Sequence, residues 1–237
     1  SVFFIASFVY LSTIEQTVSF WDCGEYIATA YKLEVGHPPG APLFQLFGRI
    51  FSLFATPGTS EVAVAINTLS ALCSSFTILF LFWTITAFSK KIIIKNQDIK
   101  TEEMILILSS GLIGSLAYTF SDSFWFSAVE GEVYAMSSLF TAATFWCIMK
   151  WEEQSHKASS GRWLILIAYL IGLSIGVHLL SLLTIPAMGM IYYFKKYQYT
   201  KSGAIKAFFI SIGILGLVQG IIIPGAVSLI SKFELFF

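Results

Sequence analysis

The sequence has few charged residues: they make up 12% of its 237 residues, against about 25% in an average soluble domain. Cysteine is also scarce, and the three cysteines, Cys23, Cys73 and Cys147, form no CxxC pair. This spacing supports neither a disulfide framework nor a cysteine-bound zinc site. The sequence has no P-loop and no GxGxxG motif, which argues against an enzyme that binds a nucleotide sugar.

Apolar residues are abundant instead, at 56% of the chain. A membrane-spanning helix needs about 20 mostly apolar residues, and several segments approach or reach this length. We therefore expect an all-α, polytopic membrane protein with one transmembrane domain, residues 1–237, of about seven spans. The first apolar run, Ser1 to Ser12, would rise only about 18 Å, and the chain stops after another apolar stretch at Phe237. We expect it to be an N-terminal fragment of a longer protein.

The basic residues are concentrated in three short segments. Of the 14 Lys and Arg residues, 11 lie within residues 90–100, 150–162 and 195–206. The positive-inside rule places such segments in the cytoplasm. The acidic segments 13–60 and 119–132 then become the first and second outer loops.

The same rule bears on the long apolar stretch from Trp163 to Phe194. It is either one tilted span or two short helices that break near Gly172 to His178. Two helices would return Lys195 to the side of the other basic loops, so the charge pattern favours two helices.

The first outer loop carries two acidic residues within the motif WDCGEY. If residues 21–32 form a helix, Asp22 and Glu25 share a face, and Asp22 stands where an N-cap is expected. Such a pair can act as a general base and its orienting partner, because the charge of one carboxylate raises the pKa of the other. The alternative is a capped interfacial helix whose carboxylates are only solvated.

Two basic groups lie further along this loop. In the motif HPPG, the rigid prolines Pro38 and Pro39 hold His37 in place, and a positioned imidazole suits phosphate binding or proton transfer. The alternative is a turn in which His37 bonds only to the backbone. Residues 41–54 are predicted to form an amphipathic interfacial helix, from which Arg49 can reach a lipid phosphate or simply extend to the interface without a specific ligand.

The second outer loop contributes Glu130 and Glu132, with Asp122 near its start. Converging acids in a loop can hold a divalent cation or an acceptor hydroxyl, so this loop is a candidate site for a divalent metal. The alternative is a solvated loop end. His178 lies within an apolar run, where ionisable residues are rare and suggest function. It could supply positive charge to a membrane-embedded anion, or only bond to a neighbouring helix.

These features together resemble the GT-C superfamily of membrane glycosyltransferases, whose members combine a first span with a long acidic outer loop and an interfacial helix. The closest resemblance is to the bacterial and animal family, once a domain of unknown function, that includes a transmembrane protein O-mannosyltransferase. It covers most of the chain and is strongest in the segments WDCGEY, HPPGAPLF and AVEGEVYAMSSL. It is weaker in the last two helices.

The resemblance implies roles for single residues. Asp22 matches the first-loop aspartate that acts as base or aligns the acceptor, and Glu25 would support it. His37, Glu130 and Glu132 would line the same outer cleft. His178 stands where related enzymes often have a basic residue near the donor phosphate, with histidine replacing the more usual lysine.

We therefore expect an inverting glycosyltransferase on the extracytoplasmic side of a membrane. The implied donor is a polyprenyl-phosphate sugar, with mannose as the expected sugar, and the implied acceptor is a protein Ser or Thr hydroxyl. The implied location is a bacterial inner membrane, or the endoplasmic reticulum for an animal relative. Membrane lipid is an expected partner and nucleic acid is not. The alternatives are a transporter or flippase of a lipid-linked or small polar substrate, and a noncatalytic membrane scaffold.

Overall fold

The computed structural model describes residues 1–38, 40–94 and 99–236, and these residues form helices and connecting loops without a strand. The expected all-α architecture is confirmed. Three short helical segments are not α-helical: η1 Ala158–Ser160 and η2 Leu179–Leu183 are 3-10 helices, and η3 Val218–Ile222 is a π-helical turn. The α-helices are α1 Val2–Ser12, α2 Cys23–Lys32, α3 Pro42–Ser52, α4 Glu61–Ile93, α5 Thr101–Thr119, α6 Asp122–Val129, α7 Val133–Gln154, α8 Gly161–Ile175, α9 Thr184–Lys196, α10 Lys201–Leu217 and α11 Ile223–Phe236.

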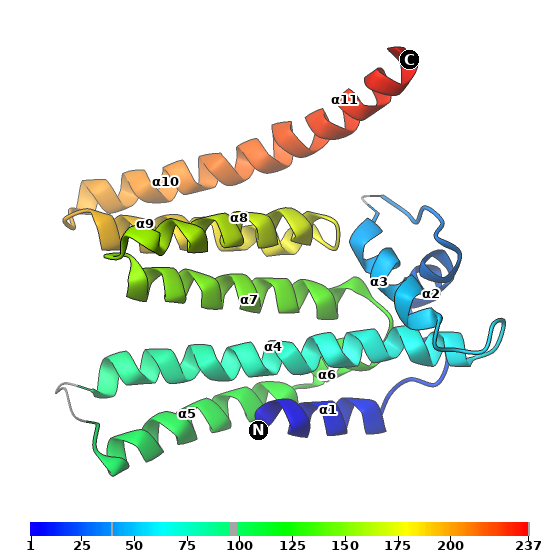
Figure 1. Cartoon of the computed structure of the whole chain (residues 1–237), viewed down its shortest axis with the longest axis horizontal. Helices are drawn as coiled ribbons and strands as arrows, with labels where there is room; N and C mark the ends of the chain where they lie inside the picture. Colours follow the sequence, from blue (N-terminus) through cyan, green and yellow to red (C-terminus); the bar gives the residue numbers. More distant parts are fainter. Residues whose placement is uncertain (39, 95–98, 237) are drawn as a thin grey trace.

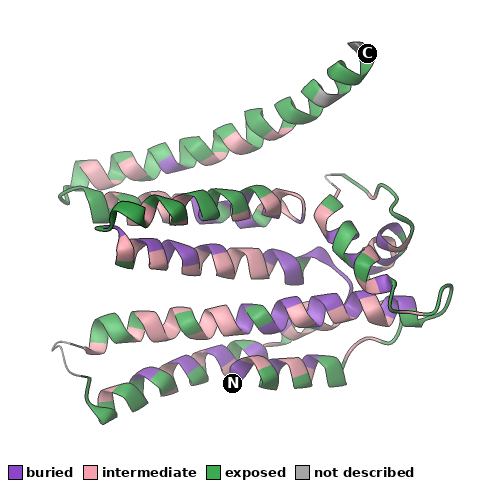
Figure 2. Ribbon diagram, in the orientation of Figure 1, coloured by how far each residue is buried: buried purple, intermediate pink, exposed green. Residues whose placement is uncertain are grey.

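The long helices lie side by side along one direction, and the short helices α2 and α3 sit together at one end (Figure 1). Helix α4 is central, because it packs against α1, α3, α5 and α7. Buried positions concentrate in α4 and α7, whereas the helix that runs from α10 into α11 is mostly exposed (Figure 2).

By length and composition, three helical segments among the described residues are apolar enough to cross a membrane: Glu61–Ile93, Ala158–Ile175 and Lys201–Leu235. Helices α5 and α6 would add a fourth if the bent pair forms one span. The exposed apolar surface of these helices fits a hydrocarbon environment. The chain is an all-α membrane protein, and the expected number of about seven passes stays a prediction.

The apolar stretch before the last basic loop forms two antiparallel helices, α8 and α9, as the charge pattern predicted (Figure 1). Ion pairs hold the ends of α4, α7 and α9 together. Glu152 at the end of α7 binds Lys91 at the end of α4, and its other oxygen lies 2.8 Å from Nζ of Lys195 at the end of α9. The three basic segments therefore share one end of the bundle, although Lys95 lies outside the described residues.

The segment 119–132 differs from the expected loop, because residues 122–129 form helix α6. This helix bends from α5 by 67°. Eight helical residues rise about 12 Å, so Asp122 is held away from Glu130 and Glu132 rather than beside them. The sequence DSFWFSAV contains neither Gly nor Pro to break a helix.

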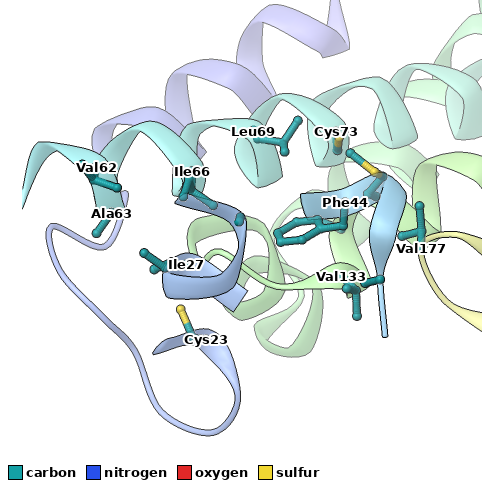
Figure 3. Close-up of a cluster of buried hydrophobic side chains, with 14 residues drawn as sticks. Cys23, Ile27, Phe44, Val62, Ala63, Ile66, Leu69, Cys73, Val133 and Val177 are labelled. Carbon is teal, nitrogen blue, oxygen red and sulfur yellow. The ribbon is translucent and has the colours of Figure 1, made fainter. Parts of the chain in front are cut away.

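A buried apolar cluster fixes α2 and α3 to the bundle. Side chains from α2, α3, α4, the start of α7 and the loop after α8 meet in it (Figure 3). Burying such side chains contributes about 1.5–3 kcal/mol each, which holds the acidic motif of α2 against the first turn of α7. The labelled members are Cys23, Ile27, Phe44, Val62, Ala63, Ile66, Leu69, Cys73, Val133 and Val177.

Candidate functional site

The first acid of the WDCGEY motif stands at the entrance of α2. Asp22 occupies the N-cap position, but its side chain accepts no capping hydrogen bond, so the capping role expected for it is wrong. The preceding residue, Trp21, has φ 62, a left-handed conformation that is a genuine outlier for a bulky side chain. Asp22 thus presents its carboxylate to solvent, with 58% of its side chain exposed.

His37 lies between the two carboxylates of the motif. Its Nδ1 is 3.0 Å from Oε2 of Glu25, and its backbone N–H donates to Oε1 of the same residue over 2.5 Å. On the other side of the ring, Nε2 is 3.9 Å from Oδ2 of Asp22. The helix spacing that puts Asp22 and Glu25 on one face and the return of the loop at His37 therefore produce one three-residue cluster. Pro39, expected to stiffen that return, lies outside the described residues.

The cluster shifts the protonation of its members. The hydrogen bond to Glu25 raises the pKa of His37, and the charges of Glu25 and Asp22 add to this effect. In turn, hydrogen bonds from the backbone and the ring of His37 lower the pKa of Glu25. The site therefore favours an imidazolium beside a carboxylate.

Glu132 approaches the same cluster from the start of α7. It is only 4% exposed, and its carboxylate accepts a hydrogen bond from the backbone N–H of Asp22. Its pKa is raised to about 7, chiefly by burial and also by the charges of Glu130 and Asp22. A carboxyl group of this kind exists in both protonation states near neutral pH, which suits general acid–base work.

Glu130 is also buried, at 3% exposure. Its side chain accepts a hydrogen bond from Ser19, and burial raises its pKa. Its second oxygen, Oε2, is buried and has no hydrogen-bond partner among the residues that the structure describes. The alternative of a solvated loop end is therefore wrong for both glutamates. A Cβ on Gly131, which lies between them, would be 3.0 Å from Ile27 of α2 and 3.2 Å from Ile66 of α4, so these two helices pack closely on the segment.

Three side chains have ligand atoms close enough to share a metal ion. Within the described residues, one oxygen each from Asp22 and Glu25 and one nitrogen of His37 lie within 4.8 Å of one another. Two carboxylates and an imidazole suit a divalent cation such as Mn²⁺. A proton on His37 would compete with the metal, since a ligating imidazole must be neutral.

Two supporting residues escaped prediction from the sequence. The ring of Tyr26 lies 5.7 Å from that of His37 and meets Phe44 edge to face; its place beside Glu25 in WDCGEY was the available signal. Asn67 in α4 donates to the backbone oxygens of Glu15 and Thr17, which pins the first loop to the bundle. An asparagine inside an apolar helix was the signal there.

Arg49 has internal partners. Its Nη1 donates to the backbone oxygen of Tyr31 over 2.9 Å, and the guanidinium lies over the Tyr31 ring, 5.2 Å from its centroid. The side chain therefore joins α3 to α2. A contact with a lipid phosphate stays a prediction.

His178 lies in the loop between α8 and η2. Its Nδ1 accepts a hydrogen bond from the backbone N–H of Leu180, and its ring is 5.5 Å from that of Tyr134. Burial lowers its pKa. This environment favours a neutral imidazole, which weakens the expectation that His178 supplies positive charge.

Comparison with known proteins gives the family. The sequence profile described as the protein O-mannosyl-transferase TMEM260 N-terminal domain matches residues 22–201. The chain is 30% identical over 141 residues to a Dictyostelium discoideum protein named protein O-mannosyl-transferase tmem260, covering 60% of this chain and 15% of that protein. It is 25% identical over 176 residues to the Mus musculus protein of the same name, covering 74% of this chain and 22% of that protein.

The chain thus spans less than a quarter of the length of the curated relatives it matches. No solved structure matches it significantly. The family match begins at Asp22, contains every other residue of the acidic cluster and covers most of the chain. The chain therefore belongs to the family of the protein O-mannosyl-transferase TMEM260 N-terminal domain.

Proposed function

We propose that the protein is a GT-C-type membrane glycosyltransferase that moves mannose from a polyprenyl-phosphate donor to a Ser or Thr hydroxyl of a protein. The observation that carries this proposal is the meeting of Asp22, Glu25, His37 and Glu132 at one end of a bundle of membrane helices. The names of the relatives support protein O-mannosylation. The acidic end of the bundle would face the extracytoplasmic side, because the basic loops lie at the other end.

Asp22 is the proposed general base. Its carboxylate is exposed and carries no capping bond, so it can reach an incoming hydroxyl. The acceptor oxygen forms a bond to the anomeric carbon while Asp22 takes the hydroxyl proton. The bond between that carbon and the phosphate oxygen breaks, and the lipid phosphate leaves with the electron pair. Attack from the face opposite the phosphate inverts the anomeric centre.

Glu25 and His37 would position this base. Glu25 binds both the backbone N–H and the ring of His37, which fixes the imidazole with its Nε2 toward Asp22. A protonated His37 offsets the charge of the carboxylates and can attract the donor phosphate. This assigns to His37 the electrostatic role that the family resemblance suggested for His178.

The lipid tail of the donor has a matching cavity. About 740 Å³ of space lies between α4, α5, α7 and η2. Ser137, on its wall, follows Glu132 by five residues on α7, or about 7.5 Å along the helix axis. A polyprenyl chain in this cavity would hold its phosphate near the acidic cluster. The wall is formed by Thr77, Leu81, Thr84, Ile85, Gly114, Tyr118, Ser137, Ser138, Thr141, Ala142, Phe145, Leu180 and Leu183.

The test measures mannose transfer from polyprenyl-phosphate-mannose to a Ser/Thr peptide by the purified protein in nanodiscs. Asp22→Asn should lose at least about 100-fold in turnover, as expected for removal of a general base, while its thermal unfolding midpoint stays near that of the wild type. The matched control is Glu34→Gln, because Glu34 is an exposed acid in the same loop that pairs with Lys32.

Unchanged turnover in Asp22→Asn would refute the assigned base. Absence of transfer by the wild type, together with flux of a lipid-linked sugar across proteoliposomes, would support the transporter alternative. Absence of both activities would support the scaffold.

A further inference from the structure

A second cavity lies at the opposite end of the bundle from the acidic cluster, between the ends of α4, α7 and α9. Its volume is about 230 Å³. The wall combines apolar side chains with a group of charged ones. It is formed by Phe88, Lys91, Met149, Glu152, Ile191, Phe194 and Lys195.

The charged part of this wall has an excess of positive charge. Lys91 and Lys195 come from different helices and share the single carboxylate of Glu152. The two lysine side chains stay 43% and 36% exposed, respectively. Each ammonium group has three N–H donors, so one shared carboxylate leaves donors available. The three groups together carry one net positive charge.

The apolar part has the character of a lipid-facing surface. Phe88 and Phe194 lie one turn or less from the two lysines along α4 and α9. An anionic group at the lysines would therefore have a hydrocarbon chain directly beside it. A phospholipid exceeds this cavity in size, so the remaining chain would lie along the exposed faces of the helices.

We propose that this cavity binds the phosphate group and upper acyl chain of an anionic phospholipid. Basic pockets between helices near the cytoplasmic face commonly bind such headgroups. Lys91 and Lys195 donate to the phosphate and share it with Glu152, while the two phenylalanines contact the chain. Because α4 and α7 also line the larger cavity, and Glu132 directly precedes α7, a lipid here would brace helices that support the proposed site. The binding itself does not depend on the proposed transferase activity.

The test titrates the purified protein in detergent with short-chain phosphatidylglycerol, phosphatidylcholine or inorganic phosphate. Thermal unfolding gives stabilisation, and native mass spectrometry counts retained lipid. Phosphatidylglycerol should raise the unfolding midpoint of the wild type and stay bound, whereas phosphatidylcholine should do neither. Lys91→Gln and Lys195→Gln should each weaken binding at least about fivefold, since each removes a charge-assisted hydrogen bond.

Two further variants make the test specific. Glu152→Gln should bind phosphatidylglycerol more tightly, because it leaves both lysines without an anionic partner. Lys150→Gln is the matched control: Lys150 is a nearby lysine that pairs with Glu153 and does not line the cavity. It should bind as the wild type does.

Several outcomes would overturn the proposal. An equal loss in Lys150→Gln would indicate attraction by the general surface charge. Weaker binding in Glu152→Gln, or equal stabilisation by both lipids, would exclude a phosphate site at these lysines. Full stabilisation by inorganic phosphate would indicate a soluble anion instead. If a lysine variant fails to fold, Lys91→Arg and Lys195→Arg keep the charge and should retain the lipid in the mass spectrum.

Discussion

His37 contacts the carboxylate of Glu25 twice. Its ring nitrogen Nδ1 lies 3.0 Å from Oε2, and its backbone N–H donates a hydrogen bond of 2.5 Å to Oε1. The residues are 12 positions apart, and the contact fixes the loop after α2 back onto that helix. The raised pKa of His37 and the lowered pKa of Glu25 have this same cause. One interaction thus sets both the shape and the charge of the candidate site.

The first prediction concerns this pair. Glu25→Gln should lower the pKa of His37, because the variant removes the charge that stabilises the imidazolium. NMR titration of His37 measures the shift, with Glu34→Gln as the control that leaves it unchanged. The pair's contribution to stability should be full between the ordinary pKa values of about 4.5 for Glu and 6.5 for His. It should fade as pH rises through the raised pKa of His37 or falls through the lowered pKa of Glu25.

An unchanged histidine titration in Glu25→Gln would contradict this assignment. It would mean that Asp22, at 3.9 Å from Nε2, sets the charge of His37 alone. The double variant with Asp22→Asn separates the two contributions, because the effects of neighbouring residues on one titration do not add.

The second prediction concerns the pH dependence conferred by Glu132. Its pKa is about 7 in the folded protein against an ordinary value of 4.5, so the folded state binds more protons than the unfolded state between these values. Stability should therefore fall as pH rises through this range. The wild type should lose about 1–3 kcal/mol of its free energy of unfolding over this pH range through Glu132, and Glu132→Gln should not show this loss. Urea unfolding at pH 5 and pH 8 measures it.

The sign of the change distinguishes this account from simple damage to the core. Relative to the wild type, Glu132→Gln should be more stable at pH 8 than at pH 5. A variant that loses the same free energy of unfolding at both pH values would show that the carboxyl group only fills space.

Local patterns predicted the helices and the first acidic pair. Apolar length indicated the long helices, amphipathic spacing indicated α3, and the three-residue spacing put Asp22 and Glu25 on one face. The basic segments predicted the division into α8 and α9. Each of these inferences used residues close in sequence, where periodicity and charge are sufficient.

Contacts between distant residues could not be predicted in this way. The hydrogen bond from the Asp22 backbone to Glu132 joins residues 110 positions apart, and no pattern within one segment indicates it. For Glu130 and Glu132 the sequence left both a binding site and a solvated loop end open, because their burial depends on α2 and α4, which pack against Gly131 between them. Arg49 was predicted to face lipid. Its contact with Tyr31 in α2 depends on how the loop between α2 and α3 folds back, which the sequence pattern does not indicate.

The third prediction tests the close packing that brings Glu132 to Asp22. A Cβ on Gly131 would lie 2.9 Å from Oδ1 of Asn67 and 3.0 Å from a side-chain carbon of Ile27. Gly131→Ala should therefore destabilise the protein by about 1–3 kcal/mol. Transfer activity should also fall under conditions in which the variant is still folded. Gly172→Ala is the control, because a Cβ there meets nothing within 4 Å and Ala favours a helix. Equal stability of the two variants would argue against tight packing.

The last prediction concerns backbone strain at Trp21. Its φ of 62 is left-handed, which costs a non-glycine residue about 1–2 kcal/mol, and its side chain is 89% exposed, so little burial offsets this cost. Trp21→Gly should be more stable than Trp21→Ala by about 1 kcal/mol, because only glycine adopts this φ freely. Phe20 is the matched control, being 79% exposed without a positive φ.

At Phe20 the order should reverse, with Ala more stable than Gly, since the extra freedom of glycine in the unfolded chain then decides the difference. Thermal and urea unfolding of the four variants measures both signs in one experiment. The same order at both positions would mean that Trp21 carries no strain. The predicted reversal would mean that the protein holds a strained residue directly before Asp22, as proteins do where a functional group must be oriented.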